Sequence, residues 1–355
     1  MQAADTVLLD REQTFGDTEQ VLLGNLTDVT VDDEGRVYIS DGEQLDIKVY
    51  DSGGSLVTLL GRSGEGPGEF NDLYKIEAKG NRLFAQDRNQ QRAVVFSLDA
   101  LTYSRTVSFA NNRQRYEELA DAYPGNIYAR TDGGFFMEFT ASSMPDNASA
   151  WDRIETREMY FLLDENGQIT SEKLIEGKSN IQVLVPLGGR KVGIPFDFYG
   201  KSLTAISEND HIYRSWSQEL LVKEYSSSGE YLGAFYYPYE RDLLDPKSAI
   251  QQMSKGAVLQ KGVQEMEFPE QWPATDAMII DDKNRIWVST FVPNHDIRRW
   301  WVLSSEGQML GHFDWPRDRW IVEIQNGFLY TEEYDEKTGL AEVVRYWVEI
   351  RKNSI

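Results

Sequence analysis

Ten side chains in this sequence have types and positions that suit a binding surface. They lie in or beside the segments that separate predicted strands, and they are Arg62, Asp87, Arg88, Arg92, Trp151, Arg190, Phe198, Trp216, Trp272 and Arg298. Arginine presents a planar fork of donors to carboxylates and hydroxyls, and aromatic rings present flat faces for stacking. Together these residues predict recognition of a small molecule, a glycan or a peptide. For each residue singly, an alternative stays open: the aromatic rings pack between strands, and the arginines pair with the many acidic residues.

Signatures of catalysis and of metal binding are sparse. The chain has no cysteine, which excludes disulfides, thiolate metal sites and cysteine nucleophiles. The three histidines are too dispersed to predict a soft-metal site, and they are His211, His295 and His312. Oxygen ligands for Ca²⁺ are available, without a spacing that singles out a set, in Glu19, Asp72, Asp87, Asn126, Asn294 and Glu332. We expect no cofactor, with Ca²⁺ as the alternative, and the catalytic residues, if any, stay unassigned.

Composition and charge limit the classes of partner. The formal net charge is −22, from 36 basic and 58 acidic residues. Such a charge repels nucleic acids and anionic membranes, which both need clusters of lysine and arginine. No apolar run reaches the roughly 18 residues needed to cross a bilayer. We therefore expect no nucleic-acid partner, no membrane span and a monomer that is secreted or periplasmic, with a cytoplasmic location as the alternative.

A degenerate repeat runs along the whole chain. The first unit spans residues 26–60 and reads as four short strands, with Asp-Asp-Glu-Gly at 32–35 and Asp-Ser-Gly-Gly at 51–54 as turns. Second strands recur with a similar pattern at 36–40, 82–86, 134–138, 211–215, 285–289 and 327–331. A period of about 40–50 residues built from short strands is typical of a β-propeller. The pattern predicts an all-β fold, a six-bladed β-propeller.

The blade limits follow from the repeat and from its interruptions. We predict a single domain, 1–355, with blades at about 23–70, 71–110, 119–177, 180–240, 272–316 and 317–350. The last unit lacks an outer strand, and residues 5–15 precede the first unit, so we expect the N-terminal strand to close the ring. A short helical insertion is expected at 241–270, and further insertions at 141–157 and 178–201. All three connect strands at the same mouth of the channel, where loops commonly carry function.

The first unit resembles the NHL repeat. Residues Asp32 to Asp41 are similar to its strand-pair motif, and the run Gly64-Glu-Gly-Pro-Gly-Glu-Phe70 is similar to its exit. The second unit keeps Asp87 and Arg92 in a loop similar to that family's, so the specific likeness covers about 70 residues. The resemblance implies a bacterial six-bladed propeller related to NHL proteins. Propellers of this size include non-enzymatic binding proteins as well as calcium-dependent lactonases and strictosidine-synthase-like enzymes.

Two functions therefore stay open from the sequence. The first is a binding propeller that recognises a small molecule, glycan or peptide at the insertion-rich mouth of the channel. The second is a metal-dependent hydrolase or lactonase, or a strictosidine-synthase-like enzyme, with its site at the same mouth. The absence of a recognisable nucleophile motif or metal-ligand spacing favours the first.

Overall fold

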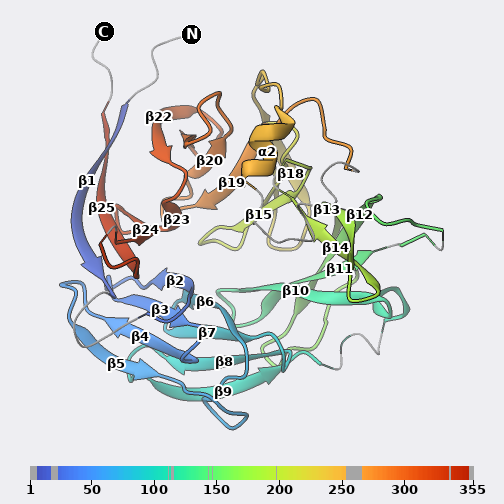
Figure 1. The fold of residues 1–355 in the computed structure, drawn as a ribbon. Coiled ribbons are helices and arrows are strands. Elements are labelled where there is room, and N and C mark those ends of the chain that lie inside the picture. The colour runs from blue at the N-terminus through green and yellow to red at the C-terminus, as the bar shows by residue number, and fades with distance from the viewer. Residues whose placement is uncertain are drawn as a thin grey trace.

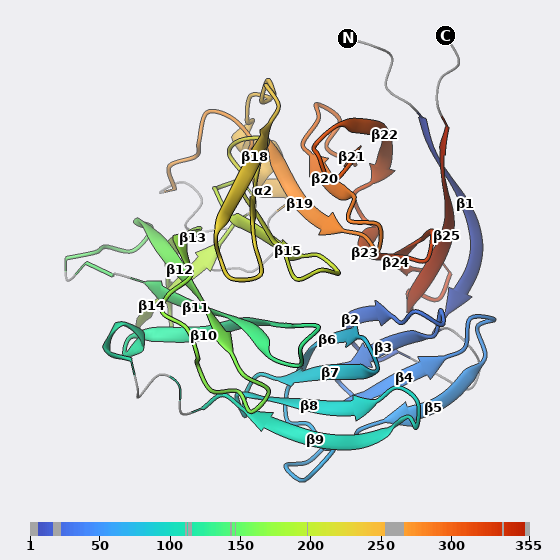
Figure 2. The same ribbon diagram turned by 180° about the vertical axis from the view of Figure 1, so that it is seen from behind.

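The computed structural model describes residues 6–16, 23–110, 112, 116–142, 144–145, 147–196, 198–252, 266–335 and 337–351. Its strands form small antiparallel sheets that stand radially around a central channel (Figures 1 and 2). Six blades can be followed in chain order, which confirms the predicted six-bladed β-propeller. Among the described residues, no helix has both the length and the apolar character needed to cross a membrane.

The first three blades come from the N-terminal half of the chain. Blade 1 holds β2 (Leu26–Val31), β3 (Val37–Asp41), β4 (Asp46–Tyr50) and β5 (Leu56–Leu60). Blade 2 holds β6 (Leu73–Lys79), β7 (Arg82–Asp87), β8 (Arg92–Ser97) and β9 (Thr102–Ser108), followed by a 3-10 turn, η1 (Glu117–Leu119). Blade 3 holds β10 (Ala122–Ala129), β11 (Phe135–Ser142), β12 (Arg153–Leu163) and β13 (Ile175–Leu187), with β14 (Arg190–Pro195) as a fifth strand. The expected insertion at 178–201 is thus the long end of β13 and its hairpin with β14.

The last three blades complete the ring. Blade 4 holds β15 (Ser202–Ile206), β16 (Ile212–Trp216), β17 (Leu221–Tyr225) and β18 (Tyr231–Tyr236). Blade 5 holds β19 (Thr275–Ile280), β20 (Ile286–Thr290), β21 (Ile297–Leu303) and β22 (Met309–Pro316). Blade 6 holds β23 (Trp320–Gln325), β24 (Phe328–Tyr334), β25 (Ala341–Arg351) and β1 (Thr6–Phe15). Between blades 4 and 5, the predicted helical insertion contains α2 (Pro246–Gln252), and its residues 253–265 lie outside the described part.

The N-terminal strand closes the ring, as the sequence predicts. Strand β1 pairs antiparallel with β25, from Thr6 opposite Arg351 to Phe15 opposite Val343. Val7 and Phe15 are buried in the cores on either side of blade 6. One parallel bridge from Thr6 to His312 also joins β1 to β22, so blades 5 and 6 form one continuous sheet. Closure thus gives the last blade its fourth strand, taken from the opposite end of the chain.

Repeated aspartates hold the turns between first and second strands. In blade 1, Asp32 accepts hydrogen bonds from the backbone N–H of Arg36, its guanidinium Nε (2.7 Å) and the Tyr38 hydroxyl (2.9 Å). In blade 5, Asp281 accepts the corresponding bonds from Arg285 and from the indole N–H of Trp287. Burial of an ionised aspartate is unfavourable, and hydrogen bonds from surrounding donors compensate for the lost hydration. The strand-pair motif seen in the sequence is therefore a local hydrogen-bonding unit.

Side chains on the innermost strands link neighbouring blades around the channel. The Asp28 carboxylate of β2 accepts the backbone N–H of Ile76 on β6 (2.9 Å), and Glu77 of β6 accepts that of Ala129 on β10 (2.9 Å). These bonds satisfy amide groups at the inner sheet edges, which would otherwise stay unpaired. All innermost strands run the same way, so their first residues surround one mouth of the channel and their last residues surround the other.

Candidate functional site

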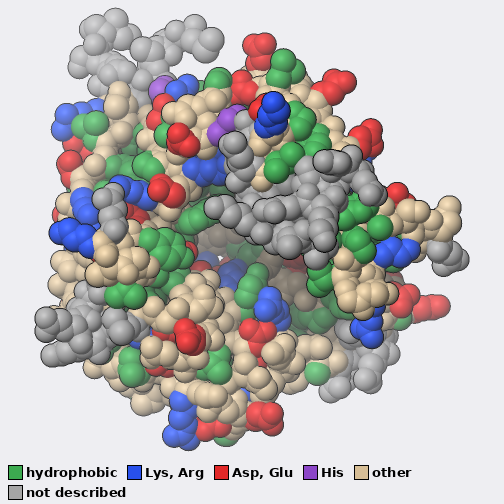
Figure 3. All heavy atoms as spheres, in the orientation of Figure 1, with side chains coloured by type: hydrophobic (Ala, Val, Ile, Leu, Met, Phe, Trp, Pro, Cys, Tyr) green, Lys and Arg blue, Asp and Glu red, His purple; other side chains and the backbone are tan. Residues whose placement is uncertain are grey.

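A cavity of about 560 Å³ lies at the mouth where the innermost strands begin. Figure 3 shows this face of the molecule, hollowed at its centre. The polar lining residues come from blades 3, 4 and 5 and are Asn126, Tyr128, Glu138, Glu158, Tyr160, Ser179, Asn180, Lys201, Ser202, Thr204 and Asp276. The other lining residues are Ile181, Pro195, Phe196, Gly200, Leu203, Ala277, Met278 and Trp320. Rigid strands thus carry most of the polar groups, and the 178–201 insertion forms one wall.

Glu158 and Arg214 form a buried ion pair beside the cavity. One carboxylate oxygen of Glu158 accepts hydrogen bonds from the Arg214 guanidinium and from the Ser202 hydroxyl (2.6 Å). Burial raises the pKa of Glu158 above its usual value, although Arg214 acts in the opposite direction. The Arg214 guanidinium also lies over the Tyr160 ring, 5.2 Å from its centre. This pair therefore fixes the positions of Ser202 and Tyr160 in the cavity wall.

Asp276 lies between two cations. Lys201 Nζ is 3.1 Å from one of its carboxylate oxygens, and Arg298 Nε is 2.8 Å from the other. Burial alone would raise the pKa of Asp276, but Lys201 and Arg298 lower it below the usual value. Asp276 is therefore ionised at neutral pH, in a triad that spans the start of β15 and two strands of blade 5.

Glu138 has a different environment, with neutral donors around it. Asn126 Nδ2 and the Thr140 hydroxyl each donate to it, both at 3.0 Å. Nearby, the Tyr160 and Thr204 hydroxyls are 3.0 Å apart. Burial raises the pKa values of Tyr128 and Tyr160 well above their usual range, so both phenols keep their protons. The cavity thus combines carboxylate acceptors with neutral hydroxyl and amide groups.

An aromatic cluster supports the insertion wall. It contains Phe196, Phe198, Tyr199, Phe268, Trp272 and Phe291. Phe196 stacks on Phe198 with ring centres 5.3 Å apart, and Trp272 stacks on Phe291 at 5.1 Å. The Tyr199 hydroxyl donates to the backbone carbonyl of Glu267 (2.6 Å), which joins the 178–201 insertion to the end of the 241–270 insertion. Packing between insertions therefore holds this wall in place.

Five of the ten predicted ligand-binding residues surround the cavity from behind its lining. Trp151, Phe198 and Trp272 pack in the aromatic cluster or against it. Arg298 pairs with Asp276, and Trp216 lies against Gly200. None of the ten is among the described residues that line the cavity. These five side chains therefore support the cavity wall and do not line it.

The other five predicted residues lie away from this cavity. Asp87 accepts backbone N–H groups of residues 71 and 72, and Arg92 pairs with it while donating to the carbonyls of residues 65 and 69. Arg88 pairs with Asp72, and Arg62 pairs with Glu69. Arg190 is exposed at the start of β14. Asp87 and Arg92 therefore hold the glycine-rich run at 64–70 against blade 2.

Sequence reasoning missed the charged groups nearest the cavity. Glu138, Glu158, Arg214 and Asp276 all lie on strands, whereas the prediction concentrated on loops. A signal was present, because Glu138 follows Phe135-Phe-Met and Arg214 follows Ile212-Tyr in strands that are otherwise apolar.

Of the possible Ca²⁺ ligands, Asn126 lines the cavity, and Glu19 lies outside the described residues. Within the described chain, no group of three His, Asp or Glu side chains is placed to hold a metal ion.

Comparison with known proteins supports the fold. Residues 16–181 match the family model DUF5128, described as a 6-bladed beta-propeller. A protein from Bacteroides fragilis named as exported has a similar structure, with TM-score 0.55 and 11% identity over 99% of this chain and 98% of that one. A member of the DUF4221 family from Bacteroides vulgatus gives TM-score 0.55 and 11% identity over 99% of this chain and 100% of that one.

A gluconolactonase from Xanthomonas campestris also matches, with TM-score 0.44 and 12% identity over 98% of this chain and 99% of that one. No curated protein matches the sequence. At these identities the likeness extends to the fold alone. The chain is a six-bladed β-propeller, and its resemblance to NHL repeats stays a prediction from the first two units.

Proposed function

We propose that this protein is a binding propeller that takes a small polar ligand into the cavity at the insertion-rich mouth. The cavity itself carries the proposal: it measures about 560 Å³ and is lined by polar side chains from blades 3, 4 and 5. Pockets for small molecules are typically roughly 300–1,000 Å³ and present a few well-placed polar groups. A concave site of this kind suits a compact ligand better than an extended peptide.

The paired charges favour binding over metal-dependent hydrolysis. Glu158 and Asp276 are engaged with Arg214, Lys201 and Arg298, so neither carboxylate is poised as a free base or as an open metal ligand. Calcium-dependent hydrolysis needs several oxygen ligands around one point. Within the described residues, no group of three acidic or histidine side chains is placed to hold a metal ion.

A cavity-filling variant tests this proposal. Thr204 lines the cavity, and Thr204→Phe would occupy part of it, whereas Thr102→Phe adds the same ring on the exposed outer strand β9. A chemically diverse library of small metabolites is screened by thermal shift, since a ligand that binds only the folded state raises the melting temperature. We expect compounds that stabilise the wild type and Thr102→Phe but not Thr204→Phe. Compounds that stabilise all three proteins equally would contradict binding in this cavity.

Export is a second part of the proposal. The sequence favours a secreted or periplasmic protein, and one protein of similar fold is named as exported. Fractionation of cells that express the full-length tagged protein tests this. We expect the protein in the periplasm or the medium, and recovery with a cytoplasmic marker enzyme would contradict it.

A further inference from the structure

We infer that the ligand of this cavity is a neutral carbohydrate, held between the Trp320 ring on one side and Glu138 with Asn126 on the other. This inference rests on the proposed binding function and specifies the chemical class of the ligand. Three features of the cavity lead to it: the balance of charge, the hydrogen-bonding capacity of Glu138, and an exposed tryptophan at the mouth.

The charge balance disfavours a ligand with a net charge. The lining carboxylates Glu138, Glu158 and Asp276 are matched in number by Lys201, Arg214 and Arg298 at the same site. Two of those carboxylates are already in ion pairs with these cations. The charges at this site therefore sum to zero, so a charged ligand would lose its hydration without meeting a net opposite charge. A neutral ligand avoids this cost.

Glu138 offers strong acceptors for hydroxyl groups. A carboxylate has about four lone-pair positions. In the structure, Asn126 and Thr140 donate to Glu138, one to each oxygen. Acceptor capacity therefore remains toward the cavity, and hydrogen bonds from a neutral hydroxyl to a carboxylate are stronger than those between neutral groups. Vicinal hydroxyls of a sugar match a carboxylate and its amide neighbour because they donate and accept at adjacent positions.

Trp320 supplies an apolar face at the same cavity. It is the first residue of β23, it lines the cavity, and 51% of its surface is exposed. By comparison, Trp272 and Trp287 are fully buried. Its exposed ring offers a flat apolar face, at the edge of a polar cavity, on which a ligand can pack. The C–H face of a pyranose is apolar and packs flat on an indole ring, whereas its hydroxyls point outward toward polar groups.

Both sides line the same cavity, and they belong to blades on opposite sides of the ring. Trp320 begins the innermost strand of blade 6, and Asn126 and Glu138 belong to β10 and β11 of blade 3. In a ring of six blades, the third and sixth stand opposite one another across the channel. Lys201, Ser202 and Asp276 line the wall on the side of blades 4 and 5. A sugar stacked on Trp320 would therefore extend across the channel toward Glu138.

Binding measurements with charged and neutral sugars test this inference. The probes are neutral mono- and disaccharides, with glucosamine as the cationic and glucuronate as the anionic counterpart, measured by saturation-transfer NMR and calorimetry. We expect at least one neutral sugar to bind at least tenfold more tightly than both charged sugars. Trp320→Ala should weaken that binding by about tenfold, the upper range for loss of one aromatic contact. Glu138→Gln should weaken it by a comparable factor.

Trp347→Ala is the matched control, since Trp347 is 45% exposed and packs against Phe328 on β24, outside the lining of the cavity. Equal losses for Trp320→Ala and Trp347→Ala would overturn the proposed stacking. If the metabolite screen yields ligands that Thr204→Phe excludes while no neutral sugar binds, the binding function stands and the carbohydrate class is wrong. If neither metabolites nor sugars bind in a way that Thr204→Phe abolishes, both proposals fail.

Discussion

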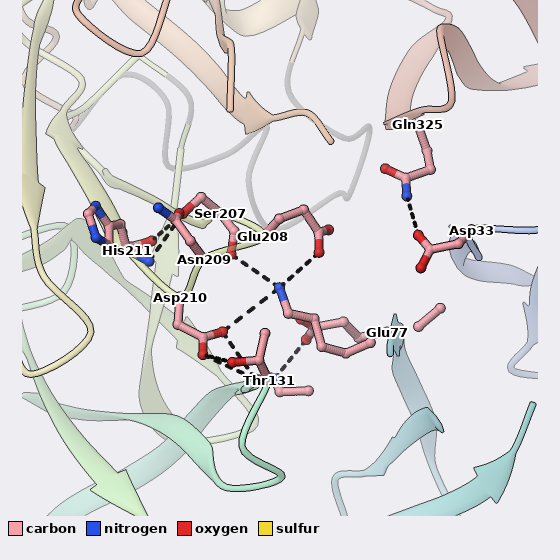
Figure 4. Close-up of polar contacts among 12 residues, drawn as sticks. Asp33, Glu77, Thr131, Ser207, Glu208, Asn209, Asp210, His211 and Gln325 are labelled. Atoms are coloured by element: carbon pink, nitrogen blue, oxygen red, sulfur yellow. Dashed lines mark hydrogen bonds and ion pairs between the residues drawn. The ribbon is translucent and has the colours of Figure 1, made fainter. Parts of the chain in front are cut away.

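Lys79 Nζ, at the end of β6 in blade 2, lies 3.1 Å from the backbone carbonyl oxygen of Ser207 in blade 4. The same ammonium is 3.4 Å from the Glu208 carboxylate and 3.9 Å from that of Asp210. Asp210 in turn accepts the hydroxyl (2.5 Å) and the backbone N–H of Thr131 in blade 3 (Figure 4). These contacts join three successive blades at the channel mouth opposite the cavity. The two mouths thus differ. At one mouth Lys79 links blade 2 to blade 4, and the other mouth holds the polar cavity.

Removal of this lysine is expected to weaken the ring. Lys79 is buried, so Lys79→Met loses the bond to the Ser207 carbonyl and leaves Asp210 without its cation. We expect the free energy of unfolding to fall by about 2 kcal/mol, the cost of leaving a buried polar partner unsatisfied. Denaturant titration measures the loss, and Lys283→Met, at an exposed turn position, serves as the control. An unchanged midpoint for Lys79→Met would show that this contact does not hold the blades together.

The buried carboxyl groups of Glu323 and Asp28 are expected to lower the free energy of unfolding at alkaline pH. Burial raises the pKa of Glu323 from 4.5 to about 8, and neighbouring Asp28, Glu208 and Glu77 add to the effect. Burial likewise raises the pKa of Asp28 to about 6. The folded state thus binds these protons more tightly than the unfolded chain, so stability is greatest below about pH 4.5 for these groups and falls as the pH rises through 8.

The size of this effect and its origin can be measured together. Each unit of pKa shift corresponds to about 1.4 kcal/mol, so Glu323 should contribute a few kcal/mol to the loss between pH 5 and pH 9. Glu323→Gln removes the titrating group and should flatten the plot of unfolding free energy against pH. Glu43→Gln, at an exposed position, should leave the slope unchanged. A wild-type slope in Glu323→Gln would rule out this carboxyl as the source.

Two glycines provide a matched test of the cavity wall. A Cβ atom at Gly200 would lie 2.2 Å from the Trp216 ring, whereas one at Gly233 on β18 meets no atom within 4 Å. Gly200→Ala must therefore shift Trp216 or the backbone that carries Lys201 and Ser202. We expect a loss of about 1–3 kcal/mol in stability from overpacking and weaker binding of any cavity ligand. Gly233→Ala should change both by little, and equal effects of the two substitutions would contradict the close packing at Gly200.

Local patterns made the fold predictable from the sequence. The motif around Asp32 needs contacts only with Arg36 and Tyr38, which lie within the next six residues, so one stretch of sequence reveals the whole hydrogen-bonding unit. The copy around Asp281 in blade 5 is equally local. Once such units recur, antiparallel strands and ring closure follow from the need to pair every sheet edge. The unpaired segment before the first unit was enough to predict the role of β1.

The site was less predictable because its contacts are distant in sequence. Glu158 meets Ser202 and Arg214, and Asp276 meets Lys201, so each pair is separated by more than 40 residues. Which inner-strand residue faces the channel depends on the register of each degenerate blade, and one sequence carries little information on register. The prediction concentrated on loops because loops commonly carry function, yet here the strands supply most of the polar groups that line the cavity.

Closure by the N-terminal strand makes Phe15 a key stabilising residue. Its ring packs against Tyr50 of blade 1 and Tyr330 of blade 6, with ring centres 5.8 Å and 6.4 Å away, and the side chain is fully buried. Phe15→Ala should lower the free energy of unfolding by about 3–5 kcal/mol, since it opens a cavity between the first and last blades. Phe15→Leu, which keeps most of the volume, should lose clearly less.

Denaturant unfolding followed by tryptophan fluorescence measures both losses. The control is Tyr231→Ala on the outer strand β18, because 59% of the surface of Tyr231 is exposed. This substitution should change the free energy of unfolding by less than about 0.5 kcal/mol. A loss for Phe15→Ala as small as that of the control would mean that β1 adds little to the joint between blades 6 and 1. Deletion of residues 1–15 should then be tolerated.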